Sequence, residues 1–493
     1  MLLEDEYIRL IFGLKLKQIR TEKNLSLFGL SKLSGLSKSY LNEIEKGKKY
    51  PKTDKILILA EKLETPYDHL VSLKLDKNLA PIGDILQSKI LKEIPLDLFG
   101  IRENNLIDII ANAPAKVNAF ISTIIKIATN YNLTRERFFL ASLRSYQEAH
   151  NNYFKELEVE AEKFTKAYQI GLKNINAGFF EEILIEEYGY TINEDELNKH
   201  ANLEELRNIF IPAKKTLLID KNVSEAQKTF IYAKELAYNF LNIEDRLYTF
   251  PWIKFESFDQ VLNNFKASYF AGALIIPQKD IVGKLEELFG SEEWNPMKLH
   301  RMIKSYNCSQ ETFYQRLTNI LTEHFNIKNL FFLRFNKPMN SEEFKLTKEL
   351  HITQQQAPHA NRSNDHYCRR WISLKTIHDL EQSKKDRPTF GIQISSYENE
   401  KSEYLVLSSA SQDPFKKDVN RSISIGLLLS PHLKRKLKFL KTDTFDRKIV
   451  GVTCETCSVQ NCKERVAPPV KVERVNRHQH IENTVEKIIK SFS

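Results

Sequence analysis

Three of the five cysteines in the chain lie between positions 454 and 462, in the stretch CETCSVQNCKERVAPP (454–469). Cys454, Cys457 and Cys462 have C-x2-C-x4-C spacing, so a tight loop can bring three thiolates to one centre. A closed tetrahedral site needs a fourth soft ligand, and Cys368, in HYCRRW (366–371), is the natural candidate. The alternatives are nearby histidines: His351, His359 and His366.

This cysteine spacing fits two kinds of metal centre. Four thiolates can hold a zinc ion that pins the structure. Four cysteines can also hold an iron–sulfur cluster, and a proline shortly after the last cysteine occurs in ferredoxin loops. Clustered surface thiols without a metal would oxidise readily, so we expect a metal centre of one kind or the other.

The segment 6–72 has helical periodicity interrupted at short, regular intervals. Ser37 is placed to cap a short helix, Gly47 to end it, and Pro51 prevents its continuation. A second short helix precedes it, across a turn at Gly35. This pattern predicts a helix-turn-helix, whose second helix enters the major groove of DNA.

The second helix of this module has an inward and an outward face. Five apolar residues are expected to face the core: Leu27, Leu30 and Leu33 of the preceding helix, and Leu41 and Ile44 of the second helix. Four residues then point outward and can reach base edges: Lys38, Ser39, Asn42 and Glu43. Lysines of the exit loop suit phosphates: Lys46, Lys48 and Lys49. The alternative is a small helical bundle with a solvated lysine-rich loop; the formal charge of +9 permits DNA binding without requiring it.

Residues 223–241, VSEAQKTFIYAKELAYNFL, resemble in their framing the helix of a zinc-peptidase-like domain. That helix carries H-E-x-x-H, in which two histidines hold zinc and the glutamate activates water. Here Lys234 and Tyr238 stand at the histidine positions, and only Glu235 remains. The usual ligand carboxylate downstream maps near Asn264. Lysine and tyrosine cannot make this zinc site, so we do not expect an enzyme.

The hydrophobic period changes after residue 325, from helical spacing to short alternating or apolar runs. Strands are expected in NLFFLRFN (329–336), YCRRWISLKTI (367–377), TFGIQISSY (389–397), EYLVLSSA (403–410) and SISIGLLLS (422–430). The N-terminal two thirds is expected to be mainly α, and the last part an α+β domain with an antiparallel sheet. The expected domains are a helix-turn-helix (1–75), a helical region (76–175), a degenerate peptidase-like domain (176–325) and a sensor domain (326–493).

The whole chain resembles the short-chain fatty acyl-CoA transcriptional regulator family (ScfR), which has an XRE-type helix-turn-helix. Besides the modules above, the resemblance is carried by IPLDLFGI (94–101), RSYQEAHNNYFKELEVEAEKF (144–164), FFLRFNKP (331–338), HYCRRW and GVTCETCSVQNCKERVAPP (451–469). It implies a 4Fe-4S iron–sulfur cluster at Cys368, Cys454, Cys457 and Cys462, near a coenzyme A pocket.

The function implied is a transcriptional regulator that binds a double-stranded DNA operator as a homodimer and senses a short-chain acyl-CoA. Candidate effector-binding residues are Arg144, Tyr153, Arg334 and Arg369. The alternative is a DNA-binding regulator with a structural zinc and a protein partner as effector. The chain has neither a long apolar run nor a basic secretory start, so we expect a cytoplasmic protein without a membrane span.

Overall fold

The computed structural model describes residues 4–73, 135–248, 257–352, 365–383, 388–397, 402–442 and 445–492. The chain divides into two compact units, one of residues 1–142 with 256–258 and one of residues 143–255 with 259–493. The helical segment predicted over 82–134, the motif IPLDLFGI and His359 lie outside the described residues. Among the described helices, none combines the length and apolarity that a membrane span requires.

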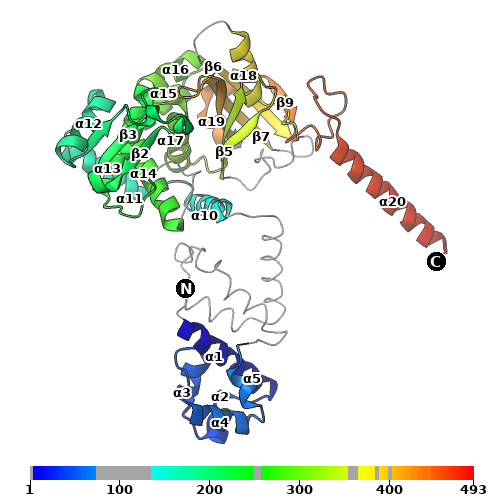
Figure 1. Cartoon of the computed structure of the whole chain (residues 1–493). Coiled ribbons are helices and arrows are strands. Elements are labelled where there is room, and N and C mark those ends of the chain that lie inside the picture. Colours follow the sequence, from blue (N-terminus) through cyan, green and yellow to red (C-terminus); the bar gives the residue numbers. More distant parts are fainter. Residues whose placement is uncertain are drawn as a thin grey trace. The chain divides into compact units, whose positions relative to one another are not determined.

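The first unit contains a compact set of short helices, drawn in blue in Figure 1. They are α1 (Glu4–Glu22), α2 (Leu27–Ser34), α3 (Lys38–Glu45), α4 (Thr53–Lys62) and α5 (Tyr67–Val71). Helix α3 begins and ends as the sequence predicts. The Ser37 hydroxyl accepts a hydrogen bond from the Tyr40 N–H at 3.1 Å, and Gly47 has a φ of +66° just beyond the helix.

The core of this module confirms most of the predicted inward residues of the two helices. Leu30, Leu41 and Ile44 are fully buried, and Leu27 is partly buried against them. The prediction for Leu33 is wrong, because its side chain is 49% exposed. The buried face of α2 runs through Leu30 and Ser34, and a residue three positions after Leu30 lies about 60° away from it around the helix.

Helix α1 holds α3 at very short range. A Cβ atom added at Gly13 would lie 2.2 Å from the carbonyl oxygen of Ile44, so the two backbones approach where only glycine fits. Arg20 donates from Nε and Nη2 to the two carboxylate oxygens of Glu45, at 2.6 and 2.9 Å. This bidentate pair and the glycine contact fix the orientation of α3 relative to α1.

We predict that Gly13→Ala destabilises the helix-turn-helix by about 2 kcal/mol or more, because α1 and α3 must separate to admit the methyl group. Hydrogen exchange of the α3 amides measures the loss as reduced protection. Gly283→Ala is the matched control, since Gly283 lies in a helix with open space around its Cβ position. That substitution should leave stability unchanged or raise it. Undiminished protection of α3 in the Gly13 variant would contradict the close approach.

The second unit begins with helices around a small sheet. The helices are α10 (Arg135–Ala149, whose first residues belong to the first unit), α11 (Lys155–Ala167), α12 (Ala177–Glu186), α13 (Glu225–Phe240), α14 (Phe258–Ile275), α15 (Gln278–Phe289), α16 (Pro296–Lys304) and α17 (Gln310–His324). The strands β1 (Thr191–Asn193), β3 (Thr216–Ile219) and β2 (Asn208–Ile211) pair in that order. The sequence SYNCSQETFYQRLTNI (305–320) suggests a helix pair, but it holds a turn and most of the single helix α17. Cys308 is packed against the core, as a small apolar residue would be.

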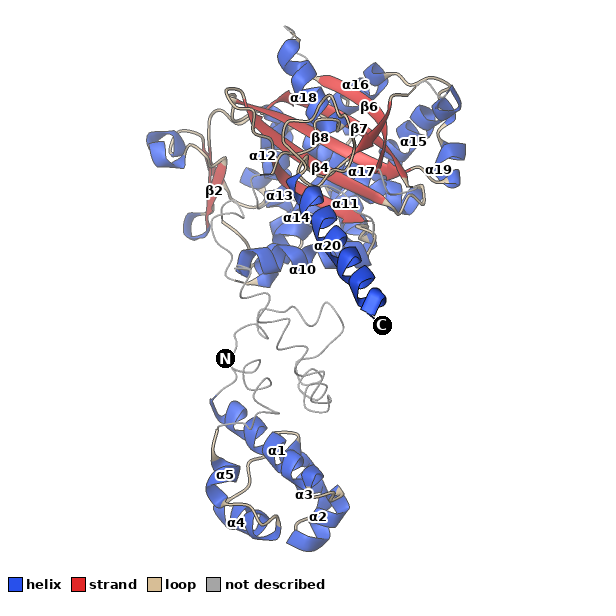
Figure 2. Cartoon of the chain, turned by 90° about the vertical axis from the view of Figure 1, so that its right-hand side faces the viewer, coloured by secondary structure: helices blue, strands red, loops and turns tan. Residues whose placement is uncertain are grey.

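A larger sheet follows, shown in red in Figure 2. Its order is β5 (Lys345–Ile352), β4 (Leu330–Pro338), β8 (Val419–Leu428), β7 (Glu403–Gln412), β6 (Thr389–Tyr397) and β9 (Arg447–Val450). All neighbours are antiparallel except β9, which joins β6 in parallel. The fold class is therefore as predicted: a mainly helical N-terminal part and an α+β C-terminal domain.

Helix α18 packs on one face of this sheet, and helix α17 packs on the other. Alternate residues of a strand point to opposite faces. Phe331, Leu333 and Phe335 of β4 share a core with helix α18 (Ile372–Gln382). Leu330 and Phe332 join the other core, which contains residues of α17. Two further helices, α19 (Pro431–Lys436) and α20 (Val470–Phe492), come later in the chain.

The strand predicted over 367–377 is wrong. Residues 367–371 form a short bridged segment, and the helix α18 follows from Ile372. The buried positions Ser373, Thr376 and Ile377 recur at three- and four-residue spacing, which is the period of a helix. Their β-branched and hydroxyl side chains favour a strand locally, and burial on the sheet overrides that preference.

Candidate functional site

Helix α3 presents the predicted DNA-contacting surface to solvent. Lys38, Ser39 and Asn42 are exposed, and so are the exit-loop residues Lys46 and Lys48. Glu43 is partly exposed and forms an ion pair with Lys49 at 2.8 Å. The structure therefore places all seven predicted residues on one short helix and the loop that follows it, while the contact of each with DNA stays a prediction.

We predict different DNA-binding defects for two of these residues. Asn42→Ala should cost about 1–3 kcal/mol on an operator selected from random DNA and relax sequence choice, because an amide can pair with a base edge. Lys48→Ala should weaken binding to operator and random DNA alike and reduce the slope of log K against log salt by about 1. Salt titrations on both DNAs check this, and a uniform effect of Asn42→Ala would place that residue at the backbone instead.

Cys368 lies beside the cysteine loop, as the sequence predicts. Tyr367 and Thr453 form an isolated antiparallel bridge. On either side of it the Cys368 N–H donates to the Val452 carbonyl at 3.2 Å, and the Cys454 N–H donates to the His366 carbonyl at 2.8 Å. Both cysteines are buried. This bridge joins two segments that are distant in sequence and brings their thiols to one place.

Cys457 belongs to the same group of thiols. Its N–H donates to the Cys454 carbonyl at 3.4 Å, and a Cβ atom added at Gly451 would lie 3.0 Å from its sulfur. Burial raises the pKa of the Cys368 thiol. The Gly451 and Arg370 N–H groups oppose this shift, and charge on Cys457 and Cys454 adds to it. The three sulfurs are therefore close enough to influence one another.

Cys462 stands apart from these three thiols in the contacts of its sulfur. It is partly exposed, and its thiol approaches the Glu464 carboxylate at 3.8 Å. Over the described ranges, no set of three or more His, Cys, Asp or Glu side chains has the arrangement of a finished metal site. The four cysteines fit a thiolate-bound centre by donor type and by chain placement, and the loop must tighten to bring Cys462 in.

Arg465 holds the carbonyl side of the loop. Its guanidinium donates to the carbonyl oxygens of Cys454 at 2.8 Å, Cys457 at 3.1 Å and Val459 at 2.8 Å. One planar group thus satisfies three backbone acceptors of an irregular turn. The sequence contains this arginine in the Arg-x-Ala-Pro-Pro tail, but spacing alone does not indicate that it binds the loop.

We predict that Arg465→Ala speeds amide exchange across residues 454–462 by about tenfold or more, because three carbonyls lose their common donor. Lys463→Ala removes an equal charge from an exposed position of the same loop and should leave exchange unchanged. The comparison is made by hydrogen exchange with mass spectrometry on the full chain. Equal exchange rates in both variants would show that Arg465 does not order the loop.

The two described histidines that are alternatives for the fourth ligand each lie beside a glutamate. His366 Nδ1 lies 2.7 Å from the Glu455 carboxylate, which also accepts the His366 N–H. His351 is buried in β5 beside Glu349, with 3.5 Å between Nε2 and the carboxylate. Cys368 therefore remains the residue best placed to complete a cysteine site.

The peptidase-like helix contains an internal polar cluster where a zinc site would lie. The Lys234 ammonium donates to Asn264 Oδ1 at 2.6 Å, and the Tyr238 hydroxyl lies 3.4 Å from the same oxygen. Burial lowers the pKa of Lys234 to about 8. Glu235, the one remaining motif residue, is buried and forms a bidentate pair with Arg246, both distances being 2.6 Å. The Lys234 ammonium cannot coordinate zinc, and the Glu235 carboxylate is already paired with Arg246. These residues therefore do not form a zinc site.

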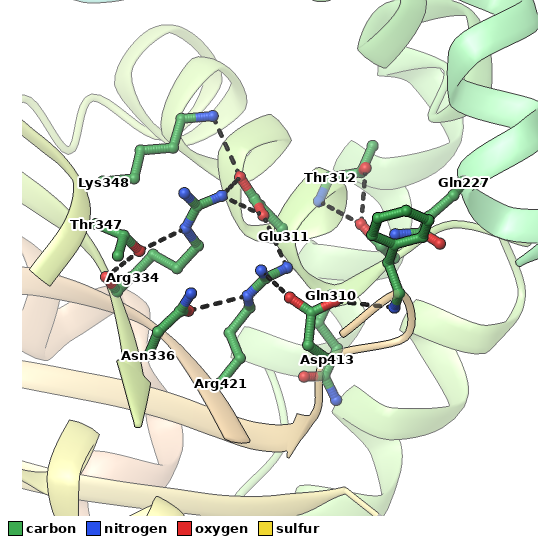
Figure 3. A network of polar contacts seen from close by, with 12 residues as sticks. Gln227, Gln310, Glu311, Thr312, Arg334, Asn336, Thr347, Lys348, Asp413 and Arg421 are labelled. Carbon is green, nitrogen blue, oxygen red and sulfur yellow. Dashed lines mark hydrogen bonds and ion pairs between the residues drawn. The ribbon is translucent and has the colours of Figure 1, made fainter. Parts of the chain in front are cut away.

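A cationic cluster lies between α17 and the large sheet (Figure 3). Arg334 donates to both carboxylate oxygens of Glu311 at 2.9 Å, and the Lys348 ammonium lies 3.2 Å from the same carboxylate. Arg421 approaches Glu311 at 3.6 Å and is paired with Asp413. Although burial opposes it, the positive charge of Arg334, Lys348 and Arg421 keeps the pKa of Glu311 well below its usual value. Three cations thus surround two carboxylates.

The other effector candidates are distributed over separate contacts. Arg144 of α10 forms an ion pair with Glu349 of β5 at 2.7 Å. The Tyr153 hydroxyl donates to Gln278 at 3.0 Å. Arg369 lies over the Phe344 ring and donates to the Glu342 carbonyl at 2.9 Å. Arg144 and Arg334 both contact the β4–β5 pair, but on opposite faces, because Glu349 is in register with Leu333 and Lys348 with Arg334. Tyr153 and Arg369 have neighbours of their own.

Comparison with known proteins supports two parts of this description. Residues 16–70 match the family model described as helix-turn-helix, and residues 185–318 match that of the IrrE N-terminal-like domain. No curated protein matches the chain. A solved Mycobacterium tuberculosis transcriptional regulator is 16% identical, with a TM-score of 0.46, over 66% of this chain and 92% of that one. A TM-score at this level does not establish a shared fold.

The helix-turn-helix match, together with the exposed polar face of α3, defines a DNA-binding regulator. The same chain carries an IrrE-like domain whose zinc-ligand positions are occupied by Lys234, Tyr238 and Asn264.

Proposed function

We propose that this DNA-binding regulator acts as a homodimer on a double-stranded operator, that its C-terminal domain senses a short-chain acyl-CoA, and that Cys368, Cys454, Cys457 and Cys462 hold a 4Fe-4S cluster. The observation that carries the proposal is the Tyr367–Thr453 bridge, which brings Cys368 to the cysteine loop. The bridge places Cys368 next to Cys454, although the two lie far apart in the sequence. The resemblance of the chain to acyl-CoA-sensing regulators supplies the effector class.

The cysteine loop is connected to the sheet domain by protein contacts. The Trp371 indole N–H donates to the Gly451 carbonyl at 2.8 Å, and Trp371 is buried at the start of α18. A bound cluster would cross-link the 366–371 segment to the 454–462 loop through its thiolate ligands. Ordering of the loop would then be transmitted through Trp371 and α18 to the face of the sheet that α18 covers.

The cationic cluster at α17 supports binding of an anionic effector. Coenzyme A carries phosphates, and guanidinium and ammonium groups are their usual protein partners. Burial lowers the pKa of Arg421 despite the neighbouring carboxylates, and the side chain of Lys348 is exposed to solvent, so an added anion would be stabilised there. An effector changes DNA affinity only by binding two states of the protein differently. In one state Glu311 would pair with these cations, and in the other a phosphate of the effector would take its place. The two states would then bind the effector with different affinity.

The cofactor is tested by absorption of the anaerobically purified full chain. An iron–sulfur protein absorbs broadly near about 400 nm. We expect this band, with iron and sulfide bound, and its loss in Cys368→Ser and Cys457→Ser variants. Cys308→Ser is the matched control, because Cys308 lies in the helical core away from the loop. A colourless protein with one zinc ion would contradict the cluster and favour a structural zinc with a protein partner as effector.

The effector is tested by gel shift on a selected operator. We predict that propionyl-CoA or acetyl-CoA at millimolar concentration changes DNA affinity, and that Lys348→Gln weakens this response about threefold to tenfold without changing affinity in its absence. Lys345→Gln, on the same strand and paired only with exposed Glu343, should respond as the wild type does. Unchanged affinity with both acyl-CoAs would refute sensing of these compounds, independently of the cofactor result.

A further inference from the structure

Helix α20 is a long helix that lies in solvent. It spans Val470–Phe492, and every residue from 473 to 491 is exposed. Figures 1 and 2 show it as one continuous helix at the C-terminal end of the chain. Most helical stability in proteins comes from packing of an apolar face, so the side chains on this helix indicate what covers it.

Three apolar side chains in the C-terminal half of α20 form one stripe. Ile481, Val485 and Ile488 follow one another at intervals of four and three residues and are 51%, 49% and 53% exposed. Such spacing places them within a narrow sector of the helix. The opposite side carries polar residues: Gln479, Asn483, Glu486 and Lys490. This is the spacing of core positions in a coiled coil, over little more than one heptad.

The charges beside the stripe are complementary to a second copy of the same helix. If Ile481 and Ile488 occupy d positions and Val485 an a position, Arg477 falls at g and Glu482 at e. In a parallel pair, a g residue faces the e residue of the next heptad on the partner, five positions later. Arg477 of one copy therefore faces Glu482 of the other, and two-fold symmetry creates the pair twice.

The same residues argue against a membrane surface as the partner. Helices that lie on anionic lipid carry a strongly basic polar face. In the C-terminal half of α20, Glu482 and Glu486 balance Lys487 and Lys490.

We propose that α20 pairs in parallel with α20 of a second copy of this chain, through the Ile481–Val485–Ile488 stripe and reciprocal Arg477–Glu482 ion pairs. This inference rests on the homodimer in the proposed function and identifies its contact surface. A stripe of little more than one heptad makes a short coiled coil, and the pairing joins two copies at their C-terminal ends.

The stripe is tested by sedimentation equilibrium of the full chain without DNA or effector. We expect a dimer, and a dissociation constant raised at least about 100-fold in Ile481→Glu/Ile488→Glu, because each copy loses two buried apolar side chains. The control Gln479→Glu/Asn483→Glu adds the same charge to the opposite side and should leave the constant unchanged. Ile481→Ala/Ile488→Ala, which preserves helix formation, should also weaken the dimer.

The register is tested by charge exchange. Arg477→Glu and Glu482→Arg should each weaken the dimer about fivefold, since like charges then face each other twice, and the double variant should recover wild-type affinity. A monomeric or trimeric wild type, or a dimer unaffected by the stripe variants, would overturn the proposal. Failure to recover affinity in the double variant would overturn the parallel register. A dimer that the stripe variants leave intact would overturn the α20 pairing alone, whereas a monomeric wild type would also contradict the homodimer of the proposed function. The absorption and gel-shift results do not depend on either outcome.

Discussion

A buried ion pair between Arg316 of α17 and Glu158 of α11 supports the second unit. Arg316 donates from Nη1 and Nη2 to the two Glu158 oxygens at 2.5 and 2.8 Å, and its Nε donates to the Ile276 carbonyl at 3.1 Å. Tyr269 donates to the same carboxylate at 2.7 Å. Burial alone would raise the pKa of Glu158, but the charge and hydrogen bonds of Arg316 lower it. Removing one member of such a pair typically costs about 3–5 kcal/mol.

The same helix carries the carboxylate that organises the cationic cluster. Glu311 contacts the large sheet, and Arg316 contacts the helices α11 and α14, so α17 is held by charge on two sides. A rigid helix held in this way cannot shift at the sheet without moving relative to the helices. This makes α17 the element through which anion binding at Arg334 and Lys348 would be felt in the rest of the unit.

Local signals in the sequence were sufficient for the helix-turn-helix and for most of the sheet. The Ser37 cap and Gly47 act within a few residues, and four of the five expected strands alternate as real strands do. Strands β5 and β9 give no strand signal in the sequence, because β5 is rich in charge and β9 is very short. Helix α18 has β-branched residues that favour a strand until the sheet beneath them is known. The apolar stripe of α20 is hard to recognise from the sequence, because it spans little more than one heptad.

The candidate sites likewise contain features that the sequence predicts and features that it does not. The cysteine spacing predicts that Cys368 lies beside the loop. A tetrahedral metal centre needs a fourth soft ligand, and that need is the same however far away in the sequence the ligand stands. The roles of Arg465 and Glu311 could not be predicted, because each depends on partners that only the folded chain brings within reach. The prediction that Leu33 is buried is wrong for a simpler reason. In a helix of only eight residues, the apolar pattern locates the buried face of α2 only to within about one position.

The Lys234–Asn264 contact also affects how the protein would respond to metal depletion. An ammonium group built into the chain cannot be stripped by a chelator or replaced by a competing ion, as a bound zinc can be. The IrrE-like domain thus keeps its internal cation regardless of metal supply. If the cysteine loop holds the proposed metal centre, metal starvation would act on that loop, while the helical part around Lys234 remains folded.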